Sequence, residues 1–113
     1  MPTIARIWSG TVDAAKADEY LEYMNKTGVS GIIETPGNLG VLVLKKVKDD
    51  EAQFTFVSFW KSLEVIAAFA GPNINRAVYY PEDKKYLKKL EPEVEHFEIA
   101  ASRGVELRGE NPL

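Results

Sequence analysis

Four side chains of this sequence carry reactive or polar groups at positions that a fold can bring together. Arg6 and Trp8 lie two residues apart near the start of the chain, Trp60 ends a later apolar stretch, and His96 is near the end. Residues two apart on a strand point to the same face, so we expect Arg6 and Trp8 to share one side of a sheet. Two indoles could hold a flat aromatic ligand and donate N–H groups to its oxygens. The alternative is that both tryptophans fill the core.

Arg6 and His96 are the candidates for charge and proton chemistry. A buried guanidinium needs an anion or an acceptor, because an unpaired buried cation is strongly unfavourable. Arg6 is therefore expected either to clamp a phenolate or carboxylate, or to form an internal salt bridge with Glu98 or another acid. His96 is the side chain whose ordinary pKa suits base chemistry near neutral pH. It would lie near Arg6 if the last strand pairs with the first, and its alternative role is a hydrogen bond within the sheet.

A second group of polar aromatic residues follows the apolar helical pattern of residues 63–70. Tyr79, Tyr80 and Arg76 are expected either to close the mouth of a pocket or to pack an irregular segment onto the sheet. Tyr20 lies on the apolar face of another predicted helix and is counted with these pocket residues. The lysines and acids that follow, Asp83 among them, are interpreted as a solvated face.

The hydrophobic periodicity predicts four strands and two main helices in the order βαββαβ. A first helix follows Asp13 and ends at Gly28, and a second begins after the N-cap Ser62 and stops at Gly71. A short helical segment is expected after Pro81. The order predicts an α+β, ferredoxin-like domain with an antiparallel sheet and the helices on one face. The predicted strands cover residues 3–12, 39–47, 53–60 and 94–100.

The second predicted strand indicates how the chain assembles. Val41, Leu42, Val43 and Leu44 place apolar groups on both faces, although helices can cover only one face. A strand that is apolar on both faces should be covered on both. We therefore expect a homodimer that joins the open sheet faces of two copies around a two-fold axis.

The composition indicates a single globular domain of 113 residues, with 45% hydrophobic and 27% charged residues. A formal charge of −3, without basic clusters, argues against nucleic acid as a partner. The absence of cysteine and the single histidine exclude thiolate and multi-histidine metal sites. The sequence shows neither a run of apolar residues long enough to span a membrane nor the pattern of a signal peptide, so we expect a cytoplasmic protein. The predicted domain covers residues 1–100, and residues 101–113 form a polar tail that is disordered or reaches across a partner.

Several segments of the chain together resemble the antibiotic biosynthesis monooxygenase (ABM) family of dimeric α+β barrel domains. The resemblance covers residues 3–100, nearly the whole chain. It implies the fold, and it leaves open which reaction is catalysed, because the family includes cofactor-free oxygenases, haem-degrading enzymes and members of unassigned activity. The segments that carry it are Ile4-Ala5-Arg6-Ile7-Trp8, Phe59-Trp60-Lys61-Ser62-Leu63, Ile66, Phe69-Ala70-Gly71, Tyr79-Tyr80-Pro81-Glu82-Asp83 and His96-Phe97-Glu98-Ile99.

The resemblance implies a cofactor-independent monooxygenase, if the protein is an enzyme, that oxidises a phenol or hydroquinone with dioxygen. In that hypothesis His96 removes a proton, Trp60 and Trp8 hold the ring, and Arg6 stabilises negative charge, with no metal or cofactor. Trp60 matches the tryptophan that lines the pocket of catalytic members. The alternatives are a non-catalytic module that binds a small aromatic molecule and a dimer with a purely structural role.

Two departures from the haem-degrading branch argue against haem chemistry. Trp8 falls where that branch has an asparagine. The region from Ile66 to Tyr80, where that branch has its histidine iron ligand, contains no histidine. A haem held by Tyr79 or Tyr80 is the remaining haem-binding alternative.

Overall fold

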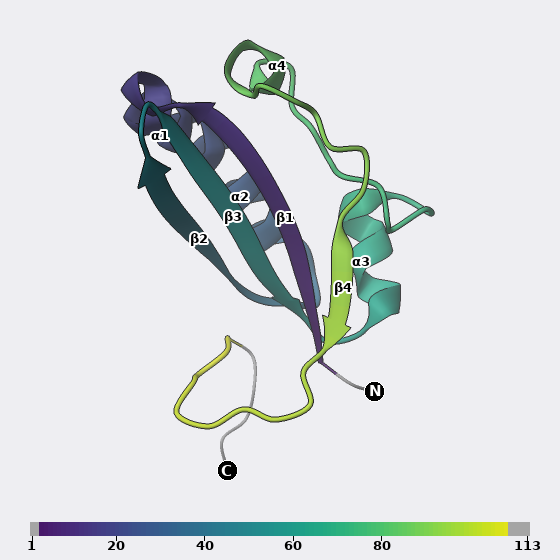
Figure 1. The fold of residues 1–113 in the computed structure, drawn as a ribbon. Helices are drawn as coiled ribbons and strands as arrows, with labels where there is room; N and C mark the ends of the chain where they lie inside the picture. Colours follow the sequence, from purple (N-terminus) through teal and green to yellow (C-terminus); the bar gives the residue numbers. More distant parts are fainter. Residues whose placement is uncertain (1–2, 109–113) are drawn as a thin grey trace.

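The structure of the chain is a computed structural model that describes residues 3–108. Its four strands form one sheet in the order β2-β3-β1-β4, in which every neighbouring pair is antiparallel (Figure 1). Because β1 lies between β3 and β4, the topology is ferredoxin-like, and the predicted α+β fold is confirmed. The strands are β1 (Ile4–Asp13), β2 (Asn38–Lys48), β3 (Glu51–Trp60) and β4 (Glu95–Glu98).

The helices pack on one face of this sheet, as predicted. Ile32 of α2 and Ile66 of α3 are buried together with Ile4 and Trp60, which are cross-strand partners on that face. Figure 1 shows α1 and α2 behind the strands, with α3 beside β4. We call this side of the sheet the helix face. The helical elements are a 3₁₀ turn (Ala14–Lys16), α1 (Ala17–Lys26), α2 (Gly28–Glu34), α3 (Leu63–Ala70) and α4 (Asp83–Tyr86).

Gly28 was predicted as the residue just past the end of the first helix, and that position is correct, because α1 ends at Lys26 with Thr27 as its C-cap; its φ, however, is not the positive one of a terminating glycine. The helical path is interrupted at Thr27 and resumes at Gly28, which begins α2. A glycine suits this position because a Cβ there would lie 3.2 Å from the ring of Phe56. Close packing against the sheet, and not a helix end, accounts for this residue.

The predicted helix caps are only partly correct. Asp13 and Ser62 have the extended backbone of N-cap residues, but neither side chain makes a capping hydrogen bond. Gly71 ends α3 as predicted, with a φ of 86°. The boundaries of α3 therefore follow from its apolar pattern and its terminal glycine rather than from a serine cap.

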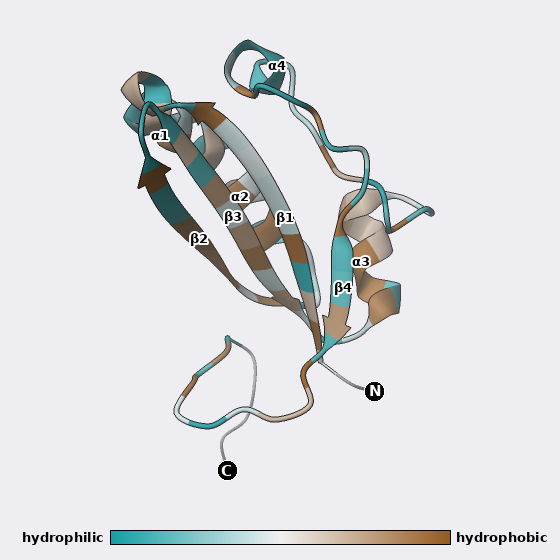
Figure 2. Cartoon of the chain, in the orientation of Figure 1, coloured by the Kyte–Doolittle hydropathy of each residue, from teal (hydrophilic) through white to brown (hydrophobic). Residues whose placement is uncertain are grey.

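The opposite side of the sheet carries apolar residues that no described element covers. Leu42 and Leu44 of β2 and Phe97 of β4 are each about half exposed. The strand register places Leu42 beside Val57, and Val57 beside Ile7. Figure 2 shows hydrophobic residues along both β2 and β3. We call this surface the open sheet face, made of Ile7, Leu42, Leu44, Val57, Phe59 and Phe97.

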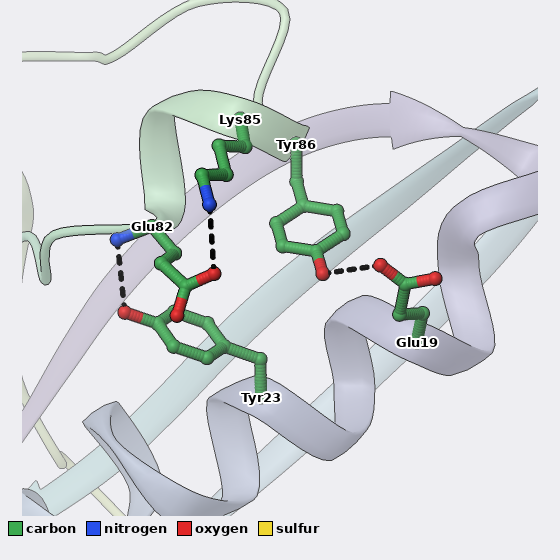
Figure 3. A network of polar contacts seen from close by, with 5 residues as sticks. All are labelled: Glu19, Tyr23, Glu82, Lys85 and Tyr86. Atoms are coloured by element: carbon green, nitrogen blue, oxygen red, sulfur yellow. Dashed lines mark hydrogen bonds and ion pairs between the residues drawn. The ribbon is translucent and has the colours of Figure 1, made fainter.

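The segment between α3 and β4 is held over the helix face by contacts between α4 and α1 (Figure 3). The rings of Tyr23 and Tyr86 stack with centroids 6.2 Å apart. The backbone N–H of Glu82 donates to the Tyr23 hydroxyl over 3.0 Å, and the Tyr86 hydroxyl donates to Glu19. That hydrogen bond to a carboxylate raises the pKa of Tyr86 to about 12. The segment is thus tied to α1 although most of it is irregular.

The described part of the predicted tail returns to its own chain. The backbone N–H of Arg108 donates to the carbonyl of Leu39, and its guanidinium donates to the carbonyl of Ile33, both over 2.7 Å. Residues 109–113 of that tail lie outside the described residues. Among residues 3–108, no helix is long and apolar enough to cross a membrane.

The turn that leads into β2 generates a stability prediction. Gly37 has a φ of 93°, and a Cβ at this position would lie 2.6 Å from the Cβ of Val65. Gly37→Ala combines left-handed strain with a clash and should lower the free energy of unfolding by about 3 kcal/mol. Gly71→Ala is the control, because its φ of 86° is similar and no atom lies within 4 Å. It should cost about 1–2 kcal/mol in urea titrations, because its ψ of −179° lies in a region that residues with a Cβ rarely adopt; equal losses in the two variants would contradict the packing argument.

Candidate functional site

A small cavity lies between the helix face of the sheet, the helices and the segment that follows α3. Its volume is about 50 Å³, which admits a few water molecules but is well below the roughly 300 Å³ of a typical ligand pocket. The predicted site residues on its wall are Arg6, Trp8, Tyr20, Tyr79 and Tyr80. The fold therefore brings together five side chains that come from β1, α1 and the segment after α3.

Arg6 is only 4% exposed, and its guanidinium joins three parts of the chain. It donates to the backbone carbonyls of Ile74 and Arg76, the latter over 2.8 Å, and to Nε2 of His96 over 2.9 Å. The salt bridge with Glu98 predicted as an alternative is not formed. No carboxylate among residues 3–108 pairs with this guanidinium.

The charge of Arg6 is therefore buried without a counter-ion. Burial lowers the pKa of Arg6 to about 10, which leaves the group protonated near neutral pH. Carbonyl oxygens and an imidazole satisfy its hydrogen bonds but carry no full negative charge. The ring of Phe69 adds a weak cation–π contact, with its centroid 5.9 Å from the guanidinium carbon. An anionic oxygen in the cavity would supply the missing countercharge.

His96 faces Arg6 across the β1–β4 pairing, as the sequence predicted. Arginine only donates hydrogen bonds, so Nε2 of His96 accepts, and the neutral imidazole carries its proton on Nδ1. Burial and the nearby Arg6 both lower the pKa of His96. A role as base requires the hydrogen bond to Arg6 to open first, and the described cavity wall does not include His96. In this geometry His96 positions the guanidinium.

Trp8 lies on the cavity wall with its polar group already bonded. Its Nε1–H donates to the hydroxyl of Tyr79 over 3.0 Å, and that hydroxyl donates to the carbonyl of Glu91 over 2.6 Å. The indole also meets the ring of Phe56 edge to face, with centroids 5.2 Å apart. Burial raises the pKa of Tyr79, so it stays a neutral donor. Trp8 therefore offers a ligand its aromatic surface, whereas its N–H is used within the protein.

Tyr80 offers a hydroxyl that forms no hydrogen bond with residues 3–108. Its ring packs against α2, and a Cβ on Gly31 would lie 2.5 Å from that hydroxyl oxygen. The glycine thus makes room for the phenol at the edge of the cavity. Burial raises the pKa of Tyr80, which keeps the hydroxyl protonated and able to donate. Among the aromatic wall residues, Tyr80 is the one whose polar end remains available.

Asp83 was predicted to lie on a solvated face, and the structure shows that this is wrong. It is only 6% exposed and lines the cavity. Its Oδ1 accepts from the hydroxyl of Tyr20 over 3.0 Å, and its Oδ2 accepts from the backbone N–H of Tyr80 over 2.7 Å. Burial makes the largest contribution to raising the pKa of Tyr20, and the negative charge of Asp83 raises it further. A signal existed in the sequence, because an acid can accept from the backbone N–H three residues before it, as Asp83 does from Tyr80.

Besides His96, two predicted site residues lie away from the cavity wall. Trp60 is fully buried, its indole N–H donates to Ser58 over 2.9 Å, and it packs with Ile66 in the core. Arg76 contributes its backbone carbonyl to Arg6, while its own side chain is exposed. Trp60 therefore fills the core, as the alternative interpretation predicted, whereas Trp8 lies next to the cavity.

Comparisons with known proteins identify the fold. Neither protein-family models nor curated proteins gave a match to this sequence. Among solved structures, a protein from Bacillus cereus assigned as an antibiotic biosynthesis monooxygenase is 17% identical, with a TM-score of 0.63 and coverage of 93% of this chain and 98% of its own. A Nitrosomonas europaea protein with the same assignment is 15% identical, with a TM-score of 0.60 and coverage of 85% and 88%.

A third similar structure is the heme-degrader MhuD of Mycobacterium tuberculosis with two hemes in its active site. It is 26% identical, with a TM-score of 0.53 and coverage of 89% of this chain and 99% of its own. The chain therefore has the ABM fold, and the structural likeness extends over almost the full length of these proteins.

The Arg6–His96 hydrogen bond predicts how stability depends on pH. A folded pKa below the unfolded value of 6.5 means that the unfolded state binds the proton more readily. Stability should be constant well above pH 6.5 and should fall as the pH decreases from 6.5 through the folded pKa. His96→Gln keeps an acceptor for Arg6 but does not titrate, so its urea midpoints should lack this decline. Parallel pH profiles for the two proteins would contradict the assignment.

Proposed function

We propose that this chain is a small ABM-like oxygenase that binds a phenolic or hydroquinone-type molecule, which reduces dioxygen directly. The observation that carries the proposal is the buried guanidinium of Arg6 on the cavity wall, where no described carboxylate neutralises it. A phenolate or enolate oxygen bound beside Arg6 would neutralise this positive charge. An electron-rich aromatic anion can pass an electron to dioxygen, and a nearby fixed cation stabilises both the organic anion and reduced oxygen.

The aromatic wall supports binding of a flat molecule. Trp8 and Phe56 provide ring surfaces on the sheet, and Phe69 provides another on α3. A ring system needs more than the present 50 Å³, so part of the wall has to move when it binds. Tyr80 is suited to move, because its hydroxyl is held by no residue in the described part and its segment is irregular. In its new position the same hydroxyl can donate to the ligand.

The residues at the cavity do not fit haem in this arrangement. The histidine that could bind iron, His96, accepts from Arg6 and lies off the described wall. The hydroxyl of Tyr79 is bonded to Trp8 and Glu91, and the raised pKa of Tyr80 disfavours the phenolate that iron requires. We therefore derive no step through haem, although the similar Mycobacterium tuberculosis protein degrades it.

In this proposal the protein acts as a homodimer whose two copies meet through the open sheet face. Leu42 is 53% exposed, Leu44 49% and Phe97 50%. Removing such a contiguous apolar surface from water stabilises an association, and a second copy presents the same surface for a two-fold contact. The cytoplasmic location expected from the sequence stays a prediction.

Oxygen uptake tests the proposed activity. Purified, metal-free protein should consume oxygen faster than autoxidation when anthrones or hydroquinones are added. Trp8→Phe removes both the indole surface and the bond to Tyr79, and it should lower kcat/KM about tenfold. Trp60→Phe is the matched control, because Trp60 lies in the core, and it should change kcat/KM less than twofold. A Trp60 effect equal to the Trp8 effect would place the ligand elsewhere.

The alternative function is non-catalytic binding of the same class of molecule. It predicts that these compounds raise the melting temperature of the protein without any oxygen uptake. The cavity supports both functions equally, and the electrode measurement separates them because binding alone consumes no oxygen.

Sedimentation velocity tests the proposed dimer. Leu42→Asp places a charge in the middle of the open sheet face and should convert dimers to monomers at micromolar concentration. Val105→Asp is the control, since Val105 is also 58% exposed but lies in the C-terminal segment outside the sheet. It should leave the sedimentation coefficient unchanged. A wild-type protein that sediments as a monomer at all concentrations would contradict the proposed dimer.

A further inference from the structure

All five tyrosines of the chain gather around the cavity and the neighbouring contact between α1 and α4. Tyr20, Tyr79 and Tyr80 line the cavity, and Tyr23 and Tyr86 stack where the two helices meet. The proposed binding of a ring uses the hydroxyl of only one of them, Tyr80. It leaves open why the other positions carry phenols rather than plain phenyl rings.

Two of these tyrosines are bonded to carboxylates. The Tyr20 hydroxyl donates to Asp83 over 3.0 Å, and the Tyr86 hydroxyl donates to Glu19 (Figure 3). Packing alone does not require these bonds, because a phenylalanine would fill nearly the same volume. At Asp83 the arrangement also buries a charge, since this carboxylate is only 6% exposed. A phenol that loses an electron becomes a strong acid, and both phenols have a base within hydrogen-bond reach.

The rings of these two tyrosines connect the interior to the surface. Their centroids lie 5.0 Å apart, within the range of direct aromatic contact. Tyr20 is only 1% exposed, whereas Tyr86 is half-buried and its partner Glu19 is exposed. The two rings therefore form a short aromatic path that begins at the cavity wall and ends beside solvent.

Trp8 is the aromatic side chain at the cavity end of this path. Its ring lies 6.3 Å from the ring of Tyr79, centroid to centroid, and its N–H donates to the Tyr79 hydroxyl. Tyr79 itself donates to a backbone carbonyl, which is not a base. Besides burial and Asp83, Tyr79 contributes to the raised pKa of Tyr20, so the two phenols lie near each other. The order from the cavity outward is therefore Trp8, Tyr79, Tyr20 and Tyr86.

We propose that three of these residues, Trp8, Tyr20 and Tyr86, carry an oxidising equivalent from the cavity to the surface. Asp83 and Glu19 accept the protons that the two tyrosines release. This inference rests on the proposed oxygenase function only for the source of the oxidant. The oxidant class is an organic peroxyl radical, which forms when dioxygen adds to a ligand radical. Such a radical would damage the cavity wall, whereas at Tyr86 a soluble reductant such as ascorbate or a thiol can remove it.

Each transfer balances in electrons and protons. The peroxyl radical takes one electron from Trp8 and becomes a peroxide anion. Trp8 then takes an electron from Tyr20, whose phenolic proton passes to Asp83. Tyr20 takes an electron from Tyr86 and recovers its proton from Asp83, while the proton of Tyr86 passes to Glu19. One electron from ascorbate and the proton held by Glu19 restore Tyr86.

Pulse radiolysis of the full chain tests the inner end of the path without any substrate. Azide radicals remove one electron from tryptophan, and tryptophanyl and tyrosyl radicals have separate absorption bands. The azide radical should react at Trp8, which is half-buried, because Trp60 is fully buried. The tryptophanyl band should decay as the tyrosyl band rises, at a rate independent of protein concentration.

The two tryptophans provide a matched pair of variants for this measurement. Trp8→Phe should lower the yield of the transferred radical at least tenfold. Trp60→Phe should leave that yield within twofold of wild type. Equal yields in the two variants would overturn the role of Trp8.

The outer end is tested by how fast added ascorbate removes the tyrosyl radical. Tyr86→Phe confines the radical to the buried Tyr20, so its removal should slow at least tenfold. Tyr23→Phe is the control, because Tyr23 stacks on the same two rings but its hydroxyl is bonded to the backbone N–H of Glu82. It should leave the rate within twofold, and equal slowing in both variants would overturn the assignment of Tyr86.

Amide variants separate proton transfer from packing. Asp83→Asn and Glu19→Gln keep an oxygen that accepts from the tyrosine but takes up no proton at neutral pH. Asp83→Asn should slow the decay of the tryptophanyl band, and Glu19→Gln should slow the removal by ascorbate, each at least fivefold. Glu19 is exposed, so Glu19→Gln decides the question if near-ultraviolet circular dichroism shows that Asp83→Asn does not fold. A wild-type rate in Glu19→Gln would mean that the bond to Tyr86 serves packing alone, and it overturns the proposal.

The outcomes also separate this inference from the proposed function. Radical transfer needs no substrate, so oxygen uptake with anthrones by a protein that shows no transfer overturns the path and leaves the oxygenase function standing. Transfer in a protein that consumes no oxygen retains the path and removes the oxygenase function. Neither transfer nor uptake would remove both.

Discussion

The site depends on one interaction, the anchoring of a buried arginine by groups that have no charge. Arg6 fixes the segment after α3 through two backbone carbonyls and fixes β4 through His96. A guanidinium can do this because its donors point in several fixed directions within one plane. A carboxylate partner would have satisfied the charge, but it would also have removed the field that reaches the cavity. The guanidinium of Arg6 therefore has hydrogen-bond partners, but no carboxylate in the described part of the chain neutralises its charge.

The opposite wall of the cavity follows a different physical rule, in which small residues permit large ones to approach. Gly28 and Gly31 lie on α2, where glycine is intrinsically unfavourable in a helix. Their missing side chains let Phe56 and the phenol of Tyr80 pack directly against the helix backbone. The helix loses some intrinsic stability, and the cavity gains an aromatic side whose hydroxyl is unbonded within the described part of the chain.

The segment between α3 and β4 carries most of the polar chemistry of the cavity, although it is largely irregular. Irregular backbone can present carbonyls to Arg6 because its own hydrogen-bonding groups are not used in a helix or ladder. Contacts of α4 with α1 restrain this segment, and Tyr20 extends that restraint to Asp83. A rigid sheet therefore provides the cation, while a restrained connection provides the anion and the hydroxyls. This division would suit the proposed binding of a ring, for which the cavity has to widen.

The sequence by itself determined the order of elements and the fold, because strand alternation and helical periodicity are local properties of the chain. It also placed Arg6, Trp8 and His96 together, since strand pairing follows from the topology. Tertiary structure decided which tryptophan meets the cavity and that Asp83 is buried. Those outcomes depend on contacts between distant segments, such as Tyr20 with Asp83, which are 63 residues apart. The local spacing of Tyr80 and Asp83 indicates a backbone hydrogen bond, but only the approach of Tyr20 from α1 buries the acid.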